Sequence, residues 1–313
     1  MRIIPGFTAL LLAALLAGFL AGCNAMQLSY NNADTALSWM ADDYLALDKP
    51  QEKMLRTRLD NLLSWHRATA LPEYADALRE TKNKVAAGLK REDIIWLIDA
   101  GRSEYDDVLS RTASQAVGVL LTISAEQIDN LEKKFARDNV KFTKEHLRGS
   151  LREQREKRAE KTMKRVEHWV GPLSDEQQEQ ITAISYAMPM TYELWRDDRI
   201  RKQQEFVAIL RDQQSPAALE ASLRQWLANW QRGKSAEYQR ASSAFQEQSV
   251  SLILAVDAMI TPAQRAKALA KLQSYIDDFK ALAVKRAQGG QAGGGQAGRA
   301  GQSGKAGLLG ASD

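Results

Sequence analysis

Cysteine and histidine are scarce in this sequence. Cys23 is the only cysteine among 313 residues. A lone thiol cannot form an internal disulfide, so the fold must be stable without one, even in an oxidising compartment. His66, His146 and His168 are too far apart in the chain to form a local pair of metal ligands such as H-x-x-x-H. We therefore expect structural or surface roles for the histidines, with no metal centre and no cofactor.

Glycine is rare in the body of the chain. Of the 19 glycines, six lie between residues 23 and 286, and they are Gly88, Gly101, Gly118, Gly149, Gly171 and Gly233. So few glycines favour helices joined by short turns over a sheet rich in hairpins. Pro72, Pro216 and Pro262 stand where the first turn of a helix tolerates a missing N–H, and Pro189 should separate two helices.

Strand-like alternation is almost absent, and the apolar residues follow helical spacing instead. Leu269, Leu272, Ile276, Phe279 and Leu282 form one stripe with steps of three and four residues. The only run compatible with a strand is VGVLLTI, at 117–123. The sequence therefore predicts an all-α protein, with roughly ten helices in an elongated multi-helix bundle.

The body of the chain has no excess of charge of either sign. The formal net charge is +4, of which residues 1–22 contribute +1 and residues 285–313 contribute +3, so residues 23–284 sum to zero. A nucleic-acid-binding protein carries its excess of Lys and Arg on the folded domain. We therefore expect no nucleic-acid partner.

The first 22 residues have the pattern of a secretory signal peptide. Arg2 precedes an apolar run from Phe7 to Leu20, which is short for a membrane span of about 20 residues. The following Leu-Ala-Gly-Cys resembles the lipobox of bacterial lipoproteins, which implies cleavage between Gly22 and Cys23 and lipid modification of Cys23, including palmitate. In such proteins Asn24 favours sorting to the outer membrane. We expect residues 23–30 to form a lipidated tether, with the membrane as a partner.

The other end of the chain is low in complexity. Residues 287–313 hold ten glycines and almost nothing apolar, so we expect a disordered tail after a helical body at 31–286.

Four short segments share the capping-box pattern of an apolar residue, Asp/Ser/Thr, two residues and Gln. They begin at Leu47, Ile123, Leu173 and Ile260. In this box the cap side chain accepts from the third helical N–H, and the Gln side chain accepts from the cap's own N–H. Their irregular spacing argues against a tandem repeat. Because Gly171 and Pro172 precede the third box, 171–173 is the candidate boundary between two subdomains.

No catalytic pattern is present. The adjacent acids Asp42-Asp43 and Asp197-Asp198 would point about 100° apart on a helix, which is typical of a solvated face and not of an acid/base pair. There is no G-x-S-x-G elbow. We expect a protein that is not an enzyme, with no catalytic residue and no metal ligand.

The best candidate for an interaction face is the charged stretch at 144–167. Arg148, Arg152 and Arg155 would lie on one helical face and could meet anionic lipid or an acidic client. The alternative is a solvated helix with i to i+4 ion pairs such as Glu153 with Lys157.

Two families resemble this chain. The boxes resemble the L-T-x-x-Q group of helical periplasmic chaperones over five residues each. An uncharacterised family of Gram-negative lipoproteins, a domain of unknown function, is similar over most of residues 20–210, through YNNAD (30–34), DDYLALD (42–48), LLSWHR (62–67), LPEYADAL (71–78), FARDNVKF (135–142), KRVEHWVGPLSDEQ (164–177) and YELWRDDRIRKQQEF (192–206). Within it, Trp65, His66 and Arg67 are a candidate pocket edge.

These observations lead to one functional expectation and one alternative. We expect an outer-membrane lipoprotein facing the periplasm, which acts as an interaction or chaperone-like module on protein clients. The alternative is a structural scaffold that binds peptidoglycan or an envelope protein complex. The oligomeric state is left open.

Overall fold

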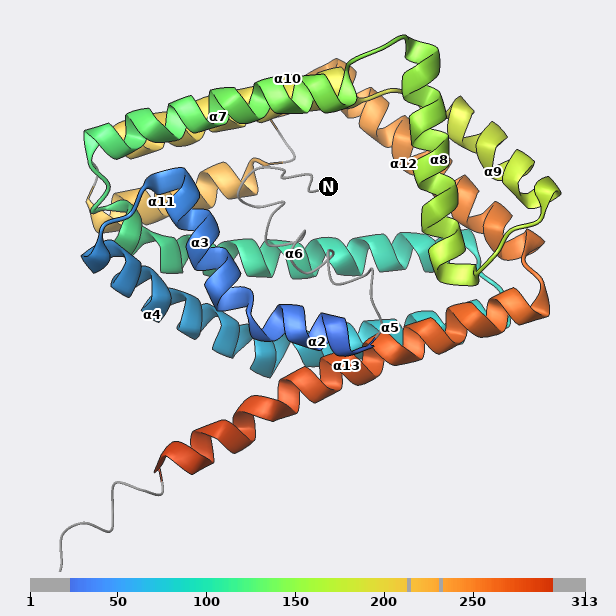
Figure 1. The fold of residues 1–313 in the computed structure, drawn as a ribbon, viewed down its shortest axis with the longest axis horizontal. Helices are drawn as coiled ribbons and strands as arrows, with labels where there is room; N and C mark the ends of the chain where they lie inside the picture. Colours follow the sequence, from blue (N-terminus) through green and yellow to red (C-terminus); the bar gives the residue numbers. More distant parts are fainter. Residues whose placement is uncertain (1–22, 213–214, 231–232, 295–313) are drawn as a thin grey trace, which may run out of the picture.

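The computed structural model describes residues 23–212, 215–230 and 233–294 (Figure 1). All secondary-structure elements in these ranges are helices, so the all-α prediction is confirmed. The expected signal peptide at 1–22 and residues 295–313 of the expected tail lie outside the described ranges.

The helices follow one another closely along the chain. They are α2 (Cys23–Asn31), α3 (Ala33–Leu45), α4 (Lys49–Trp65), the π-helix η2 (His66–Ala70), α5 (Leu71–Ala87), α6 (Arg91–Leu120), α7 (Ala125–His146), α8 (Leu151–Val170), α9 (Asp175–Ala187), α10 (Tyr192–Arg211), α11 (Pro216–Ala228), α12 (Ala236–Met259) and α13 (Pro262–Gly294).

Helix starts and stops agree with the local sequence signals. All four predicted capping boxes form, at the N-termini of α4, α7, α9 and α13. Proline occupies the first turn of α5, α11 and α13, and Pro189 lies in the break between α9 and α10. A fifth box, Ser150 with Glu153, begins α8. The pattern used for the prediction ends in Gln, so it does not include this box, which ends in Glu.

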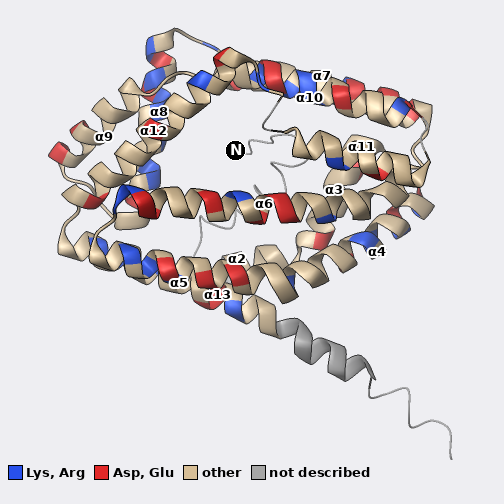
Figure 2. Cartoon of the chain, turned by 180° about the vertical axis from the view of Figure 1, so that it is seen from behind, with Lys and Arg blue, Asp and Glu red and all other residues tan. Residues whose placement is uncertain are grey.

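The helices are arranged as a closed frame (Figures 1 and 2). Around it, α13 packs on α5, which continues through η2 into α4. Helix α3 packs on α4 and α7, α7 on α10, α10 on α12, α12 on α9, α9 on α8, and α8 again on α13. Helix α6 crosses the frame and contacts α4, α5, α11 and α12.

One arrangement of helices occurs twice in this frame. The contacts α3–α4, α3–α7, α4–α6 and α5–α6 correspond to α8–α9, α8–α13, α9–α12 and α10–α12. The two copies of this arrangement are residues 23–146 and 151–294, which we call the halves. Each half packs one helix on the other half, because α5 packs on α13 and its counterpart α10 packs on α7. Irregular box spacing is thus compatible with a twofold internal arrangement, although no tandem array is present in the described part of the chain.

The glutamines of the boxes join two helix starts within each half. Gln51 and Gln127 exchange amide hydrogen bonds of 3.2 and 2.8 Å, and Gln177 and Gln264 exchange bonds of 2.9 and 3.0 Å. Each amide also donates to the carbonyl two residues before its partner's cap, at Thr122, Ala46, Met259 and Pro172. With the cap N–H bonded to each Oε1, both amide N–H groups and the amide oxygen are used.

The turn at 171–173 packs between helices that contact each other. Gly171 has a φ of 87°, which glycine adopts without strain, and it ends α8. Val170 and Leu173 are buried with Ile181 and Ala268 in one apolar cluster. The candidate boundary therefore falls inside the α8–α9 hairpin and does not separate two packed bodies.

Both ends of the described chain differ from expectation. Residues 23–30, expected as a tether, belong to helix α2, and Met26 and Tyr30 are buried. Helix α13 continues past residue 286 to Gly294. Helical structure therefore extends beyond the predicted body at both ends.

Candidate functional sites

The expected lipidation residue opens a helix that is packed on the body. Cys23 is the first residue of α2. Met26 and Tyr30, which are 5% and 6% exposed, pack with Leu71, Ile276 and Leu282 on α5 and α13. Gln27 donates to Asp278 at 2.8 Å. The burial of these side chains fixes the direction in which α2 leaves the body.

His66 lies at the junction of α2, η2 and α5. Its Nδ1 atom is 2.7 Å from Tyr30 Oη, and its ring stacks on Tyr30 and meets Tyr74 edge-on. The Nε2 atom is buried and has no hydrogen-bond partner among the described residues. Burial, with a smaller effect of the Arg67 charge, lowers the pKa of His66 to about 4. The ring is therefore neutral at physiological pH.

Trp65 and Arg67 extend this junction, and Trp65 meets the His66 ring edge-on with 6.2 Å between the ring centroids. The Arg67 guanidinium lies 4.6 Å from the Tyr30 ring centroid and donates to Leu282 O and to Asn31 Oδ1. The Arg111 guanidinium lies over the face of Trp65, 4.9 Å from the ring centroid. The three residues predicted as a pocket edge thus hold α2, α6 and α13 around the π-helix.

The predicted arginine face is only partly on a helix. Arg148 precedes α8, so the expectation that it stacks with Arg152 and Arg155 on one helical face is wrong. Arg152 is exposed and pairs with Glu156 at 2.8 Å. The Nε atom of Arg155 is buried and has no hydrogen-bond partner in the described part of the chain.

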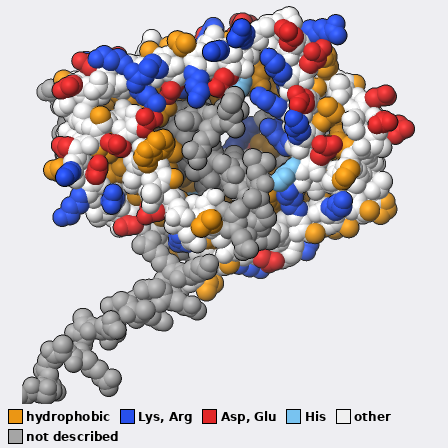
Figure 3. All heavy atoms as spheres, in the orientation of Figure 1, with side chains coloured by type: hydrophobic (Ala, Val, Ile, Leu, Met, Phe, Trp, Pro, Cys, Tyr) orange, Lys and Arg blue, Asp and Glu red, His pale blue; other side chains and the backbone are white. Residues whose placement is uncertain are grey.

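The ion pairs along α8 differ from the expected one. Glu153 accepts from the Ser150 N–H in the capping box, and the i to i+4 pairs are Arg152–Glu156 and Lys164–Glu160. Basic positions recur along α8 (Figure 2), and Lys and Arg side chains gather beside it on the face in Figure 3.

Arg158, which the sequence did not single out, is the buried arginine of α8. It is 8% exposed and donates to the carbonyl oxygens of Ser185, Met188 and Pro189 at 2.5 to 2.9 Å. These carbonyls belong to the end of α9, where helices leave acceptors unpaired. Burial lowers the pKa of Arg158.

An aromatic corner forms where α7 and α10 meet. His146 lies 4.9 Å from the Tyr192 ring centroid and 4.6 Å from that of Phe142, and Trp195 meets Phe142 edge-on. Burial, followed by the Lys161 charge, lowers the pKa of His146. The buried Nε2 of His146 lacks a partner among the described residues. We call Phe142, His146, Tyr192 and Trp195 the α7–α10 corner.

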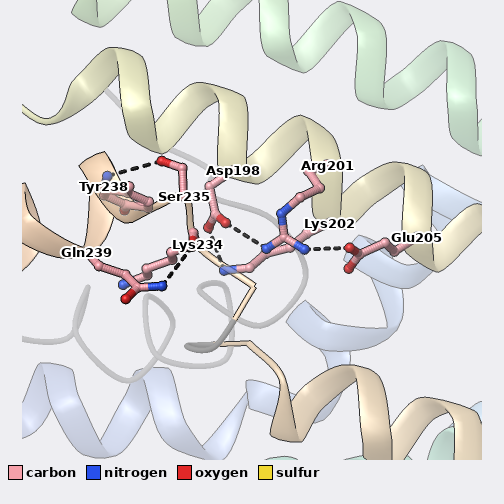
Figure 4. A network of polar contacts seen from close by, with 8 residues as sticks. All are labelled: Asp198, Arg201, Lys202, Glu205, Lys234, Ser235, Tyr238 and Gln239. Atoms are coloured by element: carbon pink, nitrogen blue, oxygen red, sulfur yellow. Dashed lines mark hydrogen bonds and ion pairs between the residues drawn. The ribbon is translucent and has the colours of Figure 1, made fainter.

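The prediction that Asp197 and Asp198 lie on a solvated face is correct for Asp197 and wrong for Asp198. Asp197 is exposed, with 62% of its side chain accessible. Asp198 is buried and pairs with Lys202 at 2.6 Å and with Arg201 at 2.7 Å (Figure 4). Lys202 also lies 3.9 Å from the Trp230 ring centroid, and burial lowers its pKa despite the Asp198 bond.

The two predicted sites lie apart in the frame. Trp65, His66 and Arg67 join α4 to α5, whereas Arg152 and Arg155 lie at the start of α8, on another side of the molecule (Figure 1). The described residues contain no group of three or more His, Cys, Asp or Glu side chains placed to hold a metal ion. None of the described helices combines the length and apolarity needed to cross a membrane.

Fold and sites together define an all-α protein whose helices close into a frame with paired capping boxes. Comparison of the sequence with known families is more specific. A model described as a family of unknown function (DUF6279) matches residues 43–239, and the chain belongs to this family. Neither the curated proteins nor the solved structures include a match.

Proposed function

We propose that this protein is a periplasm-facing lipoprotein, anchored through Cys23 to the outer membrane, that binds other proteins and performs no chemistry itself. The observation that carries the proposal is the junction of Cys23 with α2. The lipobox-like segment ends at the first residue of a helix whose Met26 and Tyr30 are buried in the body. An anchor at Cys23 would therefore hold the whole frame at the membrane surface.

The anchor is tested by replacing Cys23 with Ala in cells given labelled palmitate. We expect the native chain to incorporate label and to fractionate with the outer membrane, and the variant to do neither. Incorporation by Cys23→Ala would overturn the anchor. Fractionation of the labelled native chain with the inner membrane would overturn only the assignment to the outer membrane.

The α7–α10 corner supports the protein-binding part of the proposal. The rings of Tyr192 and Trp195 are partly exposed there, and aromatic residues are enriched where proteins bind partners.

A holdase assay tests this part. The soluble chain beginning at Asn24 should suppress aggregation of an unfolding client at stoichiometric amounts, and Tyr192→Ala with Trp195→Ala should weaken that effect. Val140→Ala, which changes an exposed apolar residue on α7, is the control. Absence of suppression by the native chain would remove the chaperone version.

The closed frame favours a second candidate, a scaffold for peptidoglycan or an envelope protein complex. A frame closed through α8–α13 and fixed by two glutamine pairs suits one stable partner. Crosslinking in cells separates the candidates, because a chaperone should yield many transient partners and a scaffold one. Sedimentation with purified sacculi tests the peptidoglycan arm directly.

A further inference from the structure

Helices α2 and α3 carry an exposed stripe without charge. Leu28 is 66% exposed and Trp39 is 63% exposed, and Asn32 and Thr35 between them are exposed as well. Leu28 lies on α2, and Thr35 and Trp39 are four residues apart on one face of α3. The chain bends between these helices at Asn32, which has φ −106° and ψ 15° (Figure 1), although Asn32 N donates to Leu28 O and Ala36 N donates to Asn32 O. We call these four residues the α2–α3 stripe.

Trp39 is unlike the other tryptophans of this chain. The other six are only partly exposed, and several pack in aromatic contacts. On the same helix Ala41, Tyr44 and Leu45 are buried in the core. Helix α3 therefore meets the body with one side and leaves a large aromatic side chain in contact with solvent on another.

We propose that the α2–α3 stripe lies against the lipid headgroups of the leaflet that holds the Cys23 lipid. This inference rests on the proposed lipidation of Cys23 and adds how the body sits on the membrane. Leu28 follows Cys23 by five residues, which is about 8 Å along a helix. The headgroup layer has a similar thickness, so a lipid at Cys23 brings Leu28 into it.

Trp39 decides the orientation. It lies 16 residues after Cys23 and on α3, beyond the bend at Asn32, so α2 and α3 must both lie at the membrane surface for both ends of the stripe to touch it (Figure 1). Packing of Met26 and Tyr30 on the body prevents α2 from turning freely about the anchor. Tryptophan is enriched at the membrane interface because its ring is apolar and its N–H needs a polar partner.

The charge pattern favours lipid as the occupant. Helix α2 contains no charged residue, and the polar members of the stripe, Asn32 and Thr35, are neutral. Asp34 lies off the stripe by helical spacing. Neutral polar groups between apolar ends can bond to headgroups without leaving a buried charge unpaired.

Because Cys23 is the only cysteine, a fluorophore can be attached at one chosen position to test this inference. Once the Cys23 thiol carries the lipid, a cysteine introduced at position 28, 35 or 39 is the only one that accepts an environment-sensitive fluorophore. The full lipidated chain would be labelled through Leu28→Cys, Thr35→Cys or Trp39→Cys and reconstituted in phosphatidylethanolamine and phosphatidylglycerol vesicles. Val140→Cys is the control, because Val140 is apolar, 71% exposed and on α7, across the frame from α2 (Figure 1).

We expect blue-shifted emission from positions 28, 35 and 39, and strong quenching by lipids that carry a nitroxide at the headgroup, with water-like emission from position 140. Emission at 28 and 39 equal to that at 140 would overturn the inference. Shielding without quenching by lipid, or shielding that depends on protein concentration in detergent, would assign the stripe to a second copy and also overturn it. Mass measurement separates the two proposals, since a chain without added lipid contradicts the anchor itself.

Discussion

His66 couples the stability of the α2 junction to pH. Its pKa is lowered from a usual value near 6.5 to about 4, chiefly by burial, so the folded chain binds this proton less readily than the unfolded chain. Stability from this group is therefore complete above about pH 6.5 and falls as the pH drops toward 4. The loss should approach about 3 kcal/mol at the acid end.

Urea unfolding at pH 7 and at pH 4.5 measures this dependence. His66→Phe keeps a ring at the site and removes the titrating group, so the variant should lose less stability than the native chain between the two pH values. His146 and His168, whose pKa values are also lowered by burial, are retained in both chains and cancel in the comparison. Equal losses in the two chains would contradict the assignment to His66.

Asp198 and Asp197 give a matched pair of neighbouring acids. Asp198→Asn would leave Lys202 buried without its counter-charge, and we expect a loss of about 3 kcal/mol in the free energy of unfolding. Asp197→Asn should change stability by less than about 0.5 kcal/mol because its side chain is exposed. Similar effects from both variants, measured by chemical denaturation, would exclude a stabilising role for the buried pair.

These two acids also show what residue patterns leave undetermined. Adjacent acids on a helix point in different directions, and that much follows from helical geometry. Which of them faces the interior depends on Trp230 and the start of α12, which are distant in sequence. No local sequence pattern indicates that Lys202 contacts Trp230. The buried ion pair of Asp198 with Lys202 therefore could not be predicted.

At the scale of the helix, the glutamine pairs convert local caps into contacts between distant segments. Gln177→Ala removes a bond to its own cap, two bonds to Gln264 and one to Met259 O, and Gln264→Ala removes the corresponding set. We expect each variant to lose about 2 kcal/mol, and the double variant to lose less than the sum because the two share bonds.

Gln51 with Gln264 is the control pair for this cycle, because the two belong to different glutamine pairs. Their effects should add to within about 0.5 kcal/mol. Thermodynamic double-mutant cycles in urea give both coupling energies. Additive behaviour of Gln177 with Gln264 would show that the hydrogen bonds between them contribute nothing to stability.

At this scale, local sequence predicts the capping boxes but not the contacts between them. A capping box needs only five residues in a row, so all four were predictable with their partners inside each box. Gln has a second role in these boxes, which the five-residue segment by itself does not indicate. Gln supplies N–H donors for a second helix, whereas the Glu153 of the fifth box has none and makes no such contact in the described structure.

At the scale of the molecule, the two halves exchange helices. Residues 23–146 contribute α5 to a contact with α13, and residues 151–294 contribute α10 to a contact with α7. Apolar burial follows the same division, because Leu71 and Ala75 of the first half are buried with Ile276 and Leu282 of the second. Neither half therefore buries its apolar surface alone, although the sequence suggested a boundary near 171–173.

This exchange predicts one cooperative unit. Chains 23–148 and 149–294, which meet in the turn before α8, should each show little helix by circular dichroism when made separately, since the α5 and α10 faces would be exposed. Mixed or co-expressed, they should form a complex that unfolds in a single transition in urea, as the intact chain should. A separate half that folds with full helicity, or two resolved transitions in the intact chain, would mean that the frame consists of two independent domains.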